Sequence, residues 1–499
     1  MTAATDPTLR RLVNGVLWPG FTGHRVPPWL ARALDEGLAG VVYFGQNIDA
    51  WDAGQPARLS AELRSIRPGV LIGIDEEGGS VSRLDAARGS LLPGHAQLGH
   101  LDDAEATRAV GRMIGRRASS AGVNVVLGPV ADVNTNPANP VIGVRAFGQD
   151  TPLVSRHVAA FVHGLQESAV AACVKHFPGH GDTQTDSHLS LPRLNLSWAE
   201  IERDHLPPFH EAVAAGVRAV MTAHIVVPEC GDLPATLNPA ILAALRGTGF
   251  AGTIVTDALD MAAIRASFGA GPGAVLALAA GAELLCIGNP SNLGPKGGRS
   301  TDEDDYLEVR KALFGALDDG ALTAGDLERA GASAARLALP AGPPEPGGSA
   351  PGIADAALMV RAAITVHGAA SVVQRRLALL DLRAHATFAV ASAADPFAAS
   401  LALDFDLDRF TPGTDDAALT ETVASLPRGT GMAVLVDRIA CAGAQRDALT
   451  RIAGLRPDAV VINAGLPSSE DPPLALIDAR GTSRVTADTV RDILRGAKP

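Results

Sequence analysis

The sequence predicts an α/β protein in which a (β/α)8 barrel of the TIM type is followed by an α/β/α sandwich domain. Three observations support this. Apolar strand-like runs alternate with helical patterns through the larger N-terminal part, a segment rich in Pro and Gly follows, and a shorter series of apolar runs comes after it. The chain has 499 residues, too many for one ordinary hydrophobic core, so two domains are expected.

Seven apolar runs in the N-terminal part have the length and composition of buried strands. They lie at 40–44, 70–74, 123–127, 169–174, 219–221, 253–255 and 284–287. Repeated strand and helix units of this length predict a parallel sheet that closes, or nearly closes, into a barrel. A complete barrel of this type needs one more strand, so we expect the eighth to be missing, weak or irregular.

The boundary between the two domains is predicted in a stretch that cannot continue a helix. Residues 337–352 read LALPAGPPEPGGSAPG, which is the composition of a semi-rigid linker. We therefore place the barrel at 1–340, the linker at 341–352 and the sandwich at 353–499. In the sandwich, strands are expected at 377–381, 433–436 and 459–462, with a helix at 442–453 before the last of them.

Composition and charge exclude several classes of function. The net charge of −12 and the isoelectric point near 5.5 argue against a surface that binds nucleic acid or an anionic membrane. The first residues lack the apolar core of a signal peptide, and no apolar run reaches the length of a membrane span. Four scattered cysteines suit buried thiols better than a disulfide framework. A cytoplasmic location is therefore expected.

The most informative segment is the polar loop after the run at 169–174. Residues 175–192 read KHFPGHGDTQTDSHLSLP, so Lys175 and His176 stand at the end of a predicted strand. The active-site residues of an α/β barrel lie at these strand ends. Asp186 and His188 lie two residues apart, close enough for the carboxylate to hold the imidazole in one tautomer. This pairing makes His188 a candidate for proton transfer near neutral pH.

A metal-binding site is the main alternative function for the same loop. On spacing alone, His176, His180, His188 and Asp182 are all candidate ligands. Their spacing matches none of the helix-borne zinc motifs, and the chemistry developed below requires no ion. We therefore expect no metal and no organic cofactor.

Other predicted strands also end in polar residues, each with a structural alternative. Asp75 follows the run at 70–74 and begins the segment DEEGGSVSR, where a carboxylate can accept hydrogen bonds from two sugar hydroxyls; the alternative is a solvated acidic loop. Asp257 follows the run at 253–255, and its alternative is a cap on the next helix. His224 follows a third run, and its position is equally consistent with an accessory site residue and with a buried histidine of the core.

The loop string resembles the signature of one family. KHFPGHG, a short spacer and then DSH are similar to the β-N-acetylglucosaminidase branch of glycoside hydrolase family 3, in its two-domain type. Four further stretches agree with this family in the same order. The resemblance covers roughly residues 10–340, and more loosely the remainder.

The resemblance implies a role for each matching residue. It implies that Asp257 is the nucleophile, that His188 is the acid and then the base, and that Asp186 orients His188. In the segment DEEGGSVSR, Ser80 departs from the arginine that is usual in the family, which puts the local pairing of that loop in doubt. Asp132 is implied as a support. The implied sugar-binding residues are Asp75, Arg83, Arg145, Lys175 and His176, with His224 as an accessory.

The implied reaction is a retaining hydrolysis that removes terminal, non-reducing, β-linked N-acetylglucosamine from short cell-wall or chitin-derived glycosides. Aromatic residues make up 4% of the chain, which leaves few platforms for long glycans and favours a short substrate. Because a histidine replaces the usual carboxylic acid, phosphate is an alternative acceptor to water. A β-glucosidase-type member of the family and an inactive sugar-binding protein are the remaining alternatives.

Overall fold

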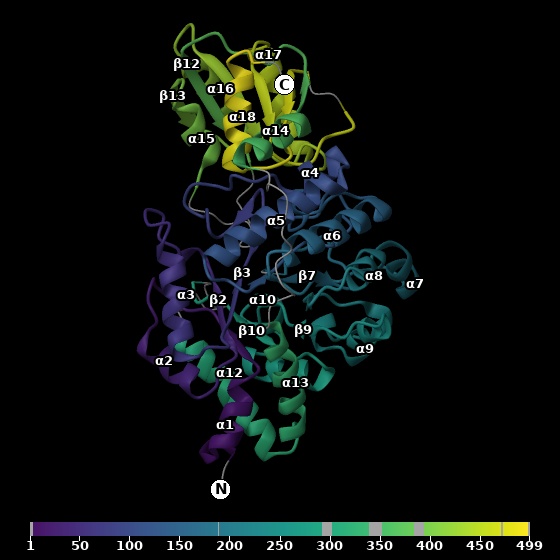
Figure 1. Ribbon diagram of the computed structural model, residues 1–499. Coiled ribbons are helices and arrows are strands. Elements are labelled where there is room, and N and C mark those ends of the chain that lie inside the picture. The colour runs from purple at the N-terminus through teal and green to yellow at the C-terminus, as the bar shows by residue number, and fades with distance from the viewer. Residues whose placement is uncertain are drawn as a thin grey trace.

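The computed structural model describes residues 3–187, 189–291, 302–338, 352–383, 394–470 and 473–497. It contains two sheet domains, and Figure 1 shows the second domain at the end of the first that lies away from the N-terminus. The predicted fold class, a barrel followed by a sandwich, is confirmed.

Eight parallel strands form the barrel wall within the described residues, and each of the seven predicted runs overlaps one of them. One sheet has the strand order β2-β3-β6-β7-β8-β9, β1 pairs with β10, and a bridge between Val255 and Leu284 joins β9 to the start of β10. The strands are β1 (Leu17–Pro19), β2 (Gly40–Tyr43), β3 (Leu71–Ile74), β6 (Val125–Val126), β7 (Ala171–Phe177), β8 (Ala219–Thr222), β9 (Thr253–Val255) and β10 (Leu285–Gly288).

The irregular eighth strand is β1, close to the N-terminus. It is three residues long, and its register with β10 shifts between Trp18 and Pro19. Trp18 is fully buried, and a Cβ atom on Gly73 of β3 would lie 2.2 Å from its ring. The indole therefore fills space inside the barrel that a larger residue at position 73 would occupy.

Helices surround the barrel, and several begin at a polar cap. Asp6, Asp103, Asp150, Asn238 and Thr323 each accept a hydrogen bond from a backbone N–H in the first turn of the helix that follows. The helices are α1 (Pro7–Asn14), α2 (Pro28–Asp35), α3 (Gln55–Ile66), α4 (His95–Leu101), α5 (Ala104–Ser120), α6 (Thr151–Gln166), α7 (Trp198–Asp204), α8 (Pro207–Ala214), α9 (Pro239–Gly247), α10 (Ala262–Arg265), α11 (Ala270–Ala280), α12 (Asp302–Asp318) and α13 (Ala324–Leu337).

Short elements decorate the loops of the barrel. A two-stranded hairpin, β4 (Glu76–Gly78) and β5 (Val81–Ser82), follows β3 directly. Single 3₁₀ turns lie at Ala3–Thr5, Gly45–Asn47, Gly143–Arg145, Pro228–Cys230 and Ala235–Leu237. The hairpin stands at the carboxyl end of β3, so it belongs to the face of the barrel that carries the candidate site.

The second domain contains a six-stranded sheet in the order β11-β16-β15-β14-β12-β13, parallel except for β11 at one edge. Its strands are β11 (Thr365–His367), β12 (Arg376–Asp381), β13 (Asp406–Phe410), β14 (Gly431–Val436), β15 (Val460–Asn463) and β16 (Ala475–Asp478). Its helices are α14 (Ile353–Ala363), α15 (Pro396–Leu401), α16 (Asp416–Ser425), α17 (Gly443–Leu455) and α18 (Arg484–Leu494). The three predicted strands and the predicted helix correspond to β12, β14, β15 and α17.

Side chains of this sheet alternate between two cores, as successive strand residues must. Leu377 and Leu379 of β12 pack in a cluster with residues of α14, α15 and α18. Ala378 and Leu380 pack on the other face with residues of α16 and α17. The predicted three-layer α/β/α arrangement follows from this alternation.

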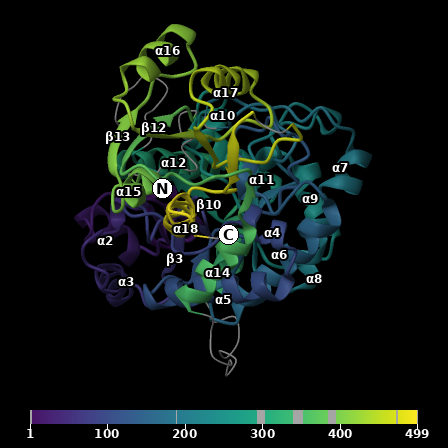
Figure 2. The same ribbon diagram turned by 90° about the horizontal axis from the view of Figure 1, so that it is seen from above.

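The two domains are joined by hydrogen bonds at the carboxyl-end face of the barrel. Gln97 Nε2 of α4 donates to the carbonyl oxygen of Ala479 at 2.8 Å and to Thr486 Oγ1 at 2.9 Å, and Val485 N donates to Ser90 O at 3.3 Å. Figure 2 shows α14 beside α4, with α18 close to both. The predicted linker at 341–352 lies, except for Gly352, outside the described residues, so the domain boundaries remain a prediction.

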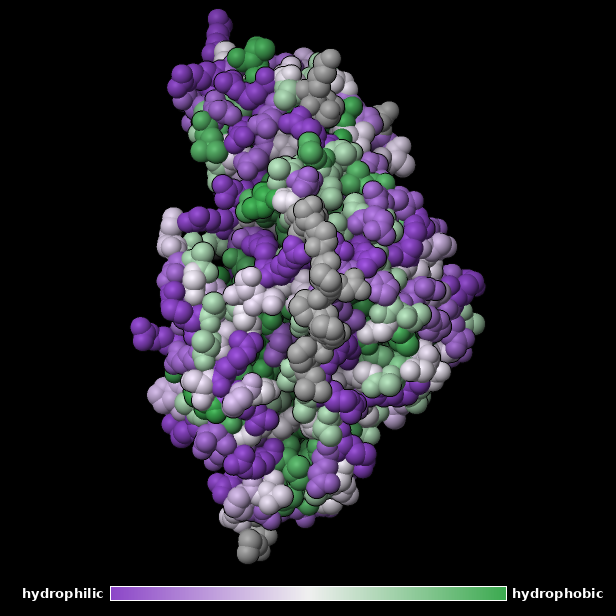
Figure 3. All heavy atoms as spheres, viewed as in Figure 1, coloured by the Kyte–Doolittle hydropathy of each residue, from purple (hydrophilic) through white to green (hydrophobic). Residues whose placement is uncertain are grey.

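No helix in the described part of the chain combines the length and the apolar character needed to cross a bilayer. Figure 3 shows hydrophobic residues scattered over one face of the molecule and not gathered into a single large patch. The four cysteines are free thiols, of which Cys173 and Cys286 are buried.

Candidate active site

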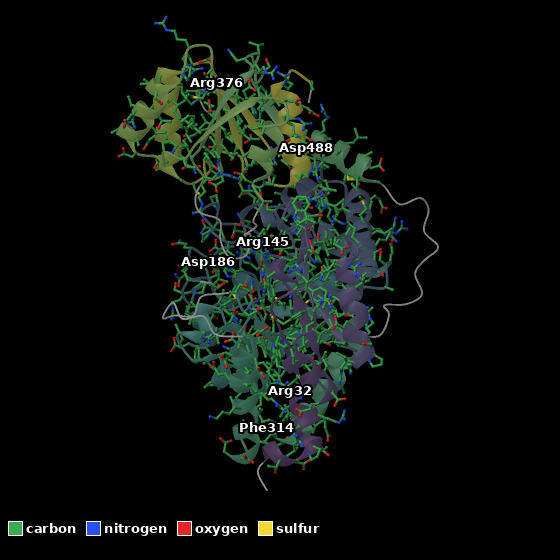
Figure 4. All side chains as sticks on the ribbon, turned by 90° about the vertical axis from the view of Figure 1, so that its left-hand side faces the viewer. Arg32, Arg145, Asp186, Phe314, Arg376 and Asp488 are labelled. Atoms are coloured by element: carbon green, nitrogen blue, oxygen red, sulfur yellow. The ribbon has the colours of Figure 1, made fainter. Side chains whose placement is uncertain are left out.

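A cavity of about 860 Å³ opens at the carboxyl ends of the barrel strands. Figure 4 shows Arg145 and Asp186 in the part of the barrel that faces the second domain. The structure brings six of the predicted site residues to the cavity wall from β3, β7, β9 and the loops beyond β5 and β6. These residues are Asp75, Arg83, Arg145, Lys175, His176 and Asp257.

A buried charge cluster forms the floor of this site. Lys175 Nζ lies 2.7 Å from Asp75 Oδ1 and 2.7 Å from Glu77 Oε1. Arg145 approaches the same Glu77 through two nitrogens, Nε at 3.0 Å and an Nη at 2.8 Å, which is the bidentate geometry of a strong pair. The cluster is held in one geometry before any substrate arrives.

Opposite charges keep these groups ionised despite their burial. Burial acts to raise the pKa of Glu77, but Arg145 and Lys175 outweigh it and hold that pKa well below its usual range. Burial likewise opposes the charge on Lys175, and Asp75 and Glu77 raise its pKa above the ordinary value. The site therefore presents both fixed acceptors and fixed donors.

Asp75 has a second cationic neighbour, Arg83, whose Nη lies 3.5 Å from Asp75 Oδ2. Burial acts to raise the pKa of Asp75, while Lys175 and Arg83 bring it below its normal value. Sequence reasoning did not single out Glu77. The available signal was the spacing of two residues, because side chains at 75 and 77 of an extended segment point to the same side.

Glu76 lies between these two carboxylates and is buried away from solvent. It accepts hydrogen bonds from Ser82 Oγ at 2.5 Å, Arg83 N at 3.0 Å and Leu84 N at 3.1 Å. Burial raises its pKa to about 7. Its contacts fix the turn that carries Arg83. The acidic triplet at 75–77 is therefore an ordered part of the site and not a solvated loop.

Asp132 supports the residues that follow β7. Its Oδ2 lies 2.8 Å from His176 Nδ1, and its Oδ1 accepts from the backbone N–H of His180 at 2.6 Å. Burial acts to raise the pKa of Asp132, but His176 and His180 together bring it below its normal value. The ring of His176 is thus oriented through Nδ1.

The loop after β7 is tied to the loop that follows Asp132. Asn139 Nδ2 donates to His180 O at 2.8 Å, and a Cβ on Gly181 would lie 1.8 Å from Val133 O, so only glycine permits this approach. His180 is buried, which lowers its pKa to about 4, and Thr183 Oγ1 lies 2.7 Å from its Nδ1. His180 is therefore neutral at physiological pH.

Of the predicted dyad, Asp186 is described and His188 lies outside the described residues. Asp186 is buried, with 4% of its surface exposed, and its carbonyl accepts from Leu189 N at 2.9 Å and from Ser190 N at 3.1 Å. Ser187 O accepts from Ala263 N at 3.2 Å, which ties the loop to the segment beyond β9. The pairing of Asp186 with His188 stays a prediction.

Asp257 follows β9 and lines the cavity, with Oδ1 accepting from Ala258 N at 2.8 Å. The next helix, α10, begins after Met261, so Asp257 does not cap it. His224 is fully buried and is absent from the described cavity wall; its Nε2 lies 2.9 Å from Ala258 O and its Nδ1 lies 2.9 Å from Thr236 Oγ1. His224 thus contacts the segment that carries Asp257.

Among the described residues, no three His, Cys, Asp or Glu side chains are grouped in a way that could hold a metal ion. His176 and His180 lie with ring centroids 5.9 Å apart, and both are engaged by hydrogen bonds to protein groups. The metal alternative involves His188, which lies outside the described part, so the absence of a cofactor remains an expectation.

Comparison with known proteins gives one consistent result. The model of the glycosyl hydrolase family 3 N terminal domain matches residues 29–328. A beta-hexosaminidase from Chromobacterium violaceum is 37% identical over 269 residues, which cover 52% of this chain and 74% of that protein. Beta-hexosaminidase A from Pseudoalteromonas piscicida is 34% identical over 265 residues, covering 48% of this chain but only 44% of the relative's length.

Solved structures extend the likeness to both domains. The structure of a glycoside hydrolase family 3 beta-N-acetylglucosaminidase from Paenibacillus sp. str. FPU-7 has a TM-score of 0.81 and 28% identity. The match covers 98% of this chain and 96% of that one. The sandwich is therefore part of the shared architecture as well as the barrel.

Proposed function

The chain belongs to glycoside hydrolase family 3, and on that premise we propose that it is a retaining, exo-acting β-N-acetylglucosaminidase. Its substrates are short cell-wall or chitin-derived glycosides with a terminal, non-reducing, β-linked N-acetylglucosamine. The beta-hexosaminidase and beta-N-acetylglucosaminidase names of its relatives support this choice of sugar.

One observation carries the proposal. Asp257 opens into the same cavity as the buried cluster of Asp75, Lys175 and Arg145. A carboxylate beside a set of fixed hydrogen-bonding groups suits the attack on an anomeric carbon, because it stabilises an oxocarbenium-like transition state and then forms a covalent glycosyl-enzyme. Asp257 is the nucleophile in this proposal.

The buried cluster recognises the terminal sugar. Asp75 and Glu77 accept hydrogen bonds from hydroxyl groups, and Lys175 and Arg145 donate them. Each cation lies against a carboxylate, so the charges largely balance, as suits a neutral ligand. Arg83 and His176, which line the same cavity, complete the recognition of the sugar.

Proton transfer is assigned to His188, oriented by Asp186. As an acid, His188 donates a proton to the leaving oxygen; as a base, it then takes a proton from the incoming water. The burial of Asp186 and the hydrogen bonds that its carbonyl accepts from Leu189 and Ser190 hold the carboxylate side of this proposed pair. His180 is not suited to the role, because it is neutral and both of its ring nitrogens face protein hydroxyls.

The experiment is proton NMR of the products from an aryl β-N-acetylglucosaminide, with and without inorganic phosphate and with a chelator throughout. We expect free N-acetylglucosamine to appear first as the β-anomer, at a rate that does not depend on phosphate. An N-acetylglucosaminyl 1-phosphate product would instead show that phosphate, and not water, is the acceptor. First appearance of the α-anomer would contradict the retaining mechanism, and no turnover would contradict the proposed activity.

A further inference from the structure

Arg145 and Glu77, the buried bidentate pair of the site, come from segments that lie 68 residues apart in the chain. Arg145 ends the single 3₁₀ turn Gly143–Arg145, and Glu77 lies in strand β4 of the hairpin. Elements this short depend on neighbouring segments for their orientation. A third segment, residues 92–95, contacts both of them and leads into α4.

The segment 92–95 contacts the hairpin through its main chain. Gly79 N donates to Leu92 O at 3.1 Å, and a Cβ atom on Gly79 would lie 2.4 Å from the Cα of Gly94. Gly79 also has a positive φ of 55°, a conformation that favours glycine. The hairpin and the start of α4 are therefore in direct backbone contact, two residues after Glu77.

The helix α4 also holds the segment that carries Arg145. His95 is the first residue of α4, and its Nδ1 lies 2.6 Å from Arg145 O. One turn further along the helix, a Cβ on Gly99 would lie 1.7 Å from Phe147 O, so only glycine permits this approach. The segment 145–147 is thus fixed against α4 at two points, and His95 supplies the side-chain contact.

The hydrogen bond to Arg145 defines the state of the His95 ring. A carbonyl oxygen only accepts, so Nδ1 carries the proton and donates. Burial lowers the pKa of His95 to about 4, and the ring is therefore neutral at physiological pH, with an unprotonated Nε2. This second nitrogen is buried and has no hydrogen-bond partner among the described residues.

The surroundings of His95 would suit an apolar ring better than a histidine. The imidazole stacks on Phe147, with ring centroids 4.2 Å apart, and packs edge-on against Phe161 at 5.1 Å. A phenylalanine would fill this place without burying an unpaired nitrogen, which costs stability. What the histidine adds is the donor at Nδ1, from which Arg145 O accepts.

Arg145 keeps donors for a ligand. Three of its N–H groups donate to described residues: Nε and one Nη to Glu77, and the other Nη to Val141 O. The side chain lines the cavity. Because all N–H groups of a guanidinium lie in one rigid plane, a shift of the backbone at Arg145 would move the remaining donors away from a bound sugar.

We propose that His95 is a positioning residue for sugar binding: its Nδ1–H fixes the backbone of Arg145, so that the guanidinium meets both Glu77 and the terminal sugar in one geometry. The inference rests on the proposed function, which makes the sugar the ligand of Arg145. His95 itself is absent from the described cavity wall, so it acts through Arg145 and not on the sugar.

The test separates the ring of His95 from its donor. His95→Phe keeps an aromatic ring between Phe147 and Phe161 and removes the hydrogen bond. We expect KM for an aryl β-N-acetylglucosaminide to rise about 5-fold, with kcat within about 2-fold of the natural chain, because Arg145 binds the sugar and does not react with it.

His95→Asn and His95→Gln form a matched pair, since both lose the ring. The amide nitrogen of asparagine is one bond from Cγ, as Nδ1 is, whereas that of glutamine lies near the position of Nε2. We expect His95→Asn to recover most of the lost affinity and His95→Gln to recover little of it. If His95→Phe does not fold, the comparison of these two variants decides alone.

His157→Phe is the control. His157 is also buried and stacks on Phe147, but its ring nitrogens face Thr107 Oγ1 at 2.7 Å and Asp102 Oδ1 at 3.3 Å. Its replacement removes hydrogen bonds of the same kind from the same aromatic cluster without touching Arg145. KM should therefore stay unchanged in this variant.

A binding measurement separates failure of this role from failure of the function. Calorimetric titration with N-acetylglucosamine should give a Kd about 5-fold higher in His95→Phe and close to the natural value in His95→Asn. An unchanged Kd in His95→Phe, or equal losses in His95→Asn and His95→Gln, overturns the role of His95 while the proposed function stands. If the natural chain neither cleaves the aryl glycoside nor binds the sugar, the proposed function fails and the role of His95 fails with it.

Discussion

Thr482 of the sandwich domain donates two hydrogen bonds to one atom of the barrel, the hydroxyl oxygen of Ser80. The backbone N–H donates at 3.3 Å and the Thr482 hydroxyl donates at 3.0 Å. Ser80 connects β4 to β5, three residues after Glu77, and it stands where the family resemblance leads us to expect arginine. At this departure from the family pattern, the second domain thus holds the hairpin β4–β5, next to the proposed sugar-binding residues.

Ser80→Ala tests whether this contact positions the site. Loss of two hydrogen bonds is expected to lower the free energy of unfolding by about 1 kcal/mol. KM for an aryl β-N-acetylglucosaminide is expected to rise about 3-fold while kcat changes little, because the loosened hairpin carries proposed sugar-binding groups and not the proposed nucleophile. Chemical denaturation and steady-state kinetics provide both numbers.

Ser65→Ala is the control for this variant. Ser65 is exposed on α3, and among the described residues its hydroxyl bonds only to Glu62 O of the same helix, at 2.7 Å. It should change neither number. An unchanged KM in Ser80→Ala, together with lower stability, would mean that the contact joins the domains without positioning the hairpin.

Glu77→Gln leaves Arg145 and Lys175 with an uncharged partner in a buried site. Both cations contact Glu77 within about 3 Å, and their side chains are 5% and 3% exposed. Breaking a buried pair from one side costs about 3–5 kcal/mol, since the remaining charges stay desolvated. We expect a loss of this size in denaturant unfolding. Glu62→Gln, at an exposed site on α3, should cost less than about 0.5 kcal/mol.

Glu76 gives the barrel a defined dependence of stability on pH. Burial raises its pKa from 4.5 to about 7, so the folded state binds a proton more tightly than the unfolded chain does. The contribution of Glu76 is therefore fully present below about pH 4.5, is lost as the pH rises toward 7, and is constant above that. The loss is on the order of 3 kcal/mol.

The measurement is the free energy of unfolding between pH 4.5 and 8, in the natural chain and in Glu76→Gln. Glutamine does not titrate, so the difference between the two curves isolates Glu76 from every other group. We expect the difference to change with pH in the window from 4.5 to 7 and to be flat above it. Parallel curves would show that Glu76 keeps an ordinary pKa.

Sequence patterns located the strand ends well because a buried strand and the polar residue after it are both local signals. Asp75, Lys175 and Asp257 each follow such a run, and each lies on the cavity wall. The sequence did not predict where β1 lies, although it did predict that the eighth strand would be missing, weak or irregular. Leu17, Trp18 and Pro19 show no strand pattern, and they are buried only because the barrel closes around them.

The role of Glu77 could not be predicted, because it depends on contacts made at long range. Glu77 meets Arg145 across 68 residues, and Lys175 meets Asp75 across 100. Nothing local distinguishes an acidic residue of this kind from one in a solvated loop.

Asp257→Asn tests the nucleophile. Removing the carboxylate that forms the glycosyl-enzyme is expected to lower kcat at least about 10³-fold, with the fold intact by circular dichroism. Asp257→Gly with azide should recover turnover and give the α-glycosyl azide, since azide then attacks from the vacated face. Asp182→Asn is the control, because Asp182 contacts Thr135 Oγ1 at 2.9 Å outside the cavity wall. Full activity in Asp257→Asn would assign the nucleophile elsewhere.

Steady-state kinetics can distinguish two roles for His224: binding of the substrate, and positioning of Asp257. Its Nε2 lies 2.9 Å from Ala258 O, and its other ring nitrogen lies 2.9 Å from Thr236 Oγ1, so both nitrogens already face protein groups. A hydrogen bond to Ala258, the residue after the proposed nucleophile, fixes the backbone from which the Asp257 side chain projects. We therefore expect His224 to act through Asp257 and not on the sugar.

His224→Ala should accordingly lower kcat about 10- to 100-fold and leave KM nearly unchanged, because a small displacement of the nucleophile affects the transition state more than the bound substrate. His224→Gln keeps a donor near the position of Nε2 and should recover part of the lost kcat. A histidine that binds the sugar directly would instead give a higher KM in both variants, with kcat less affected. Steady-state kinetics of the two variants therefore distinguish these roles, provided that both unfold at the same denaturant concentration as the natural chain.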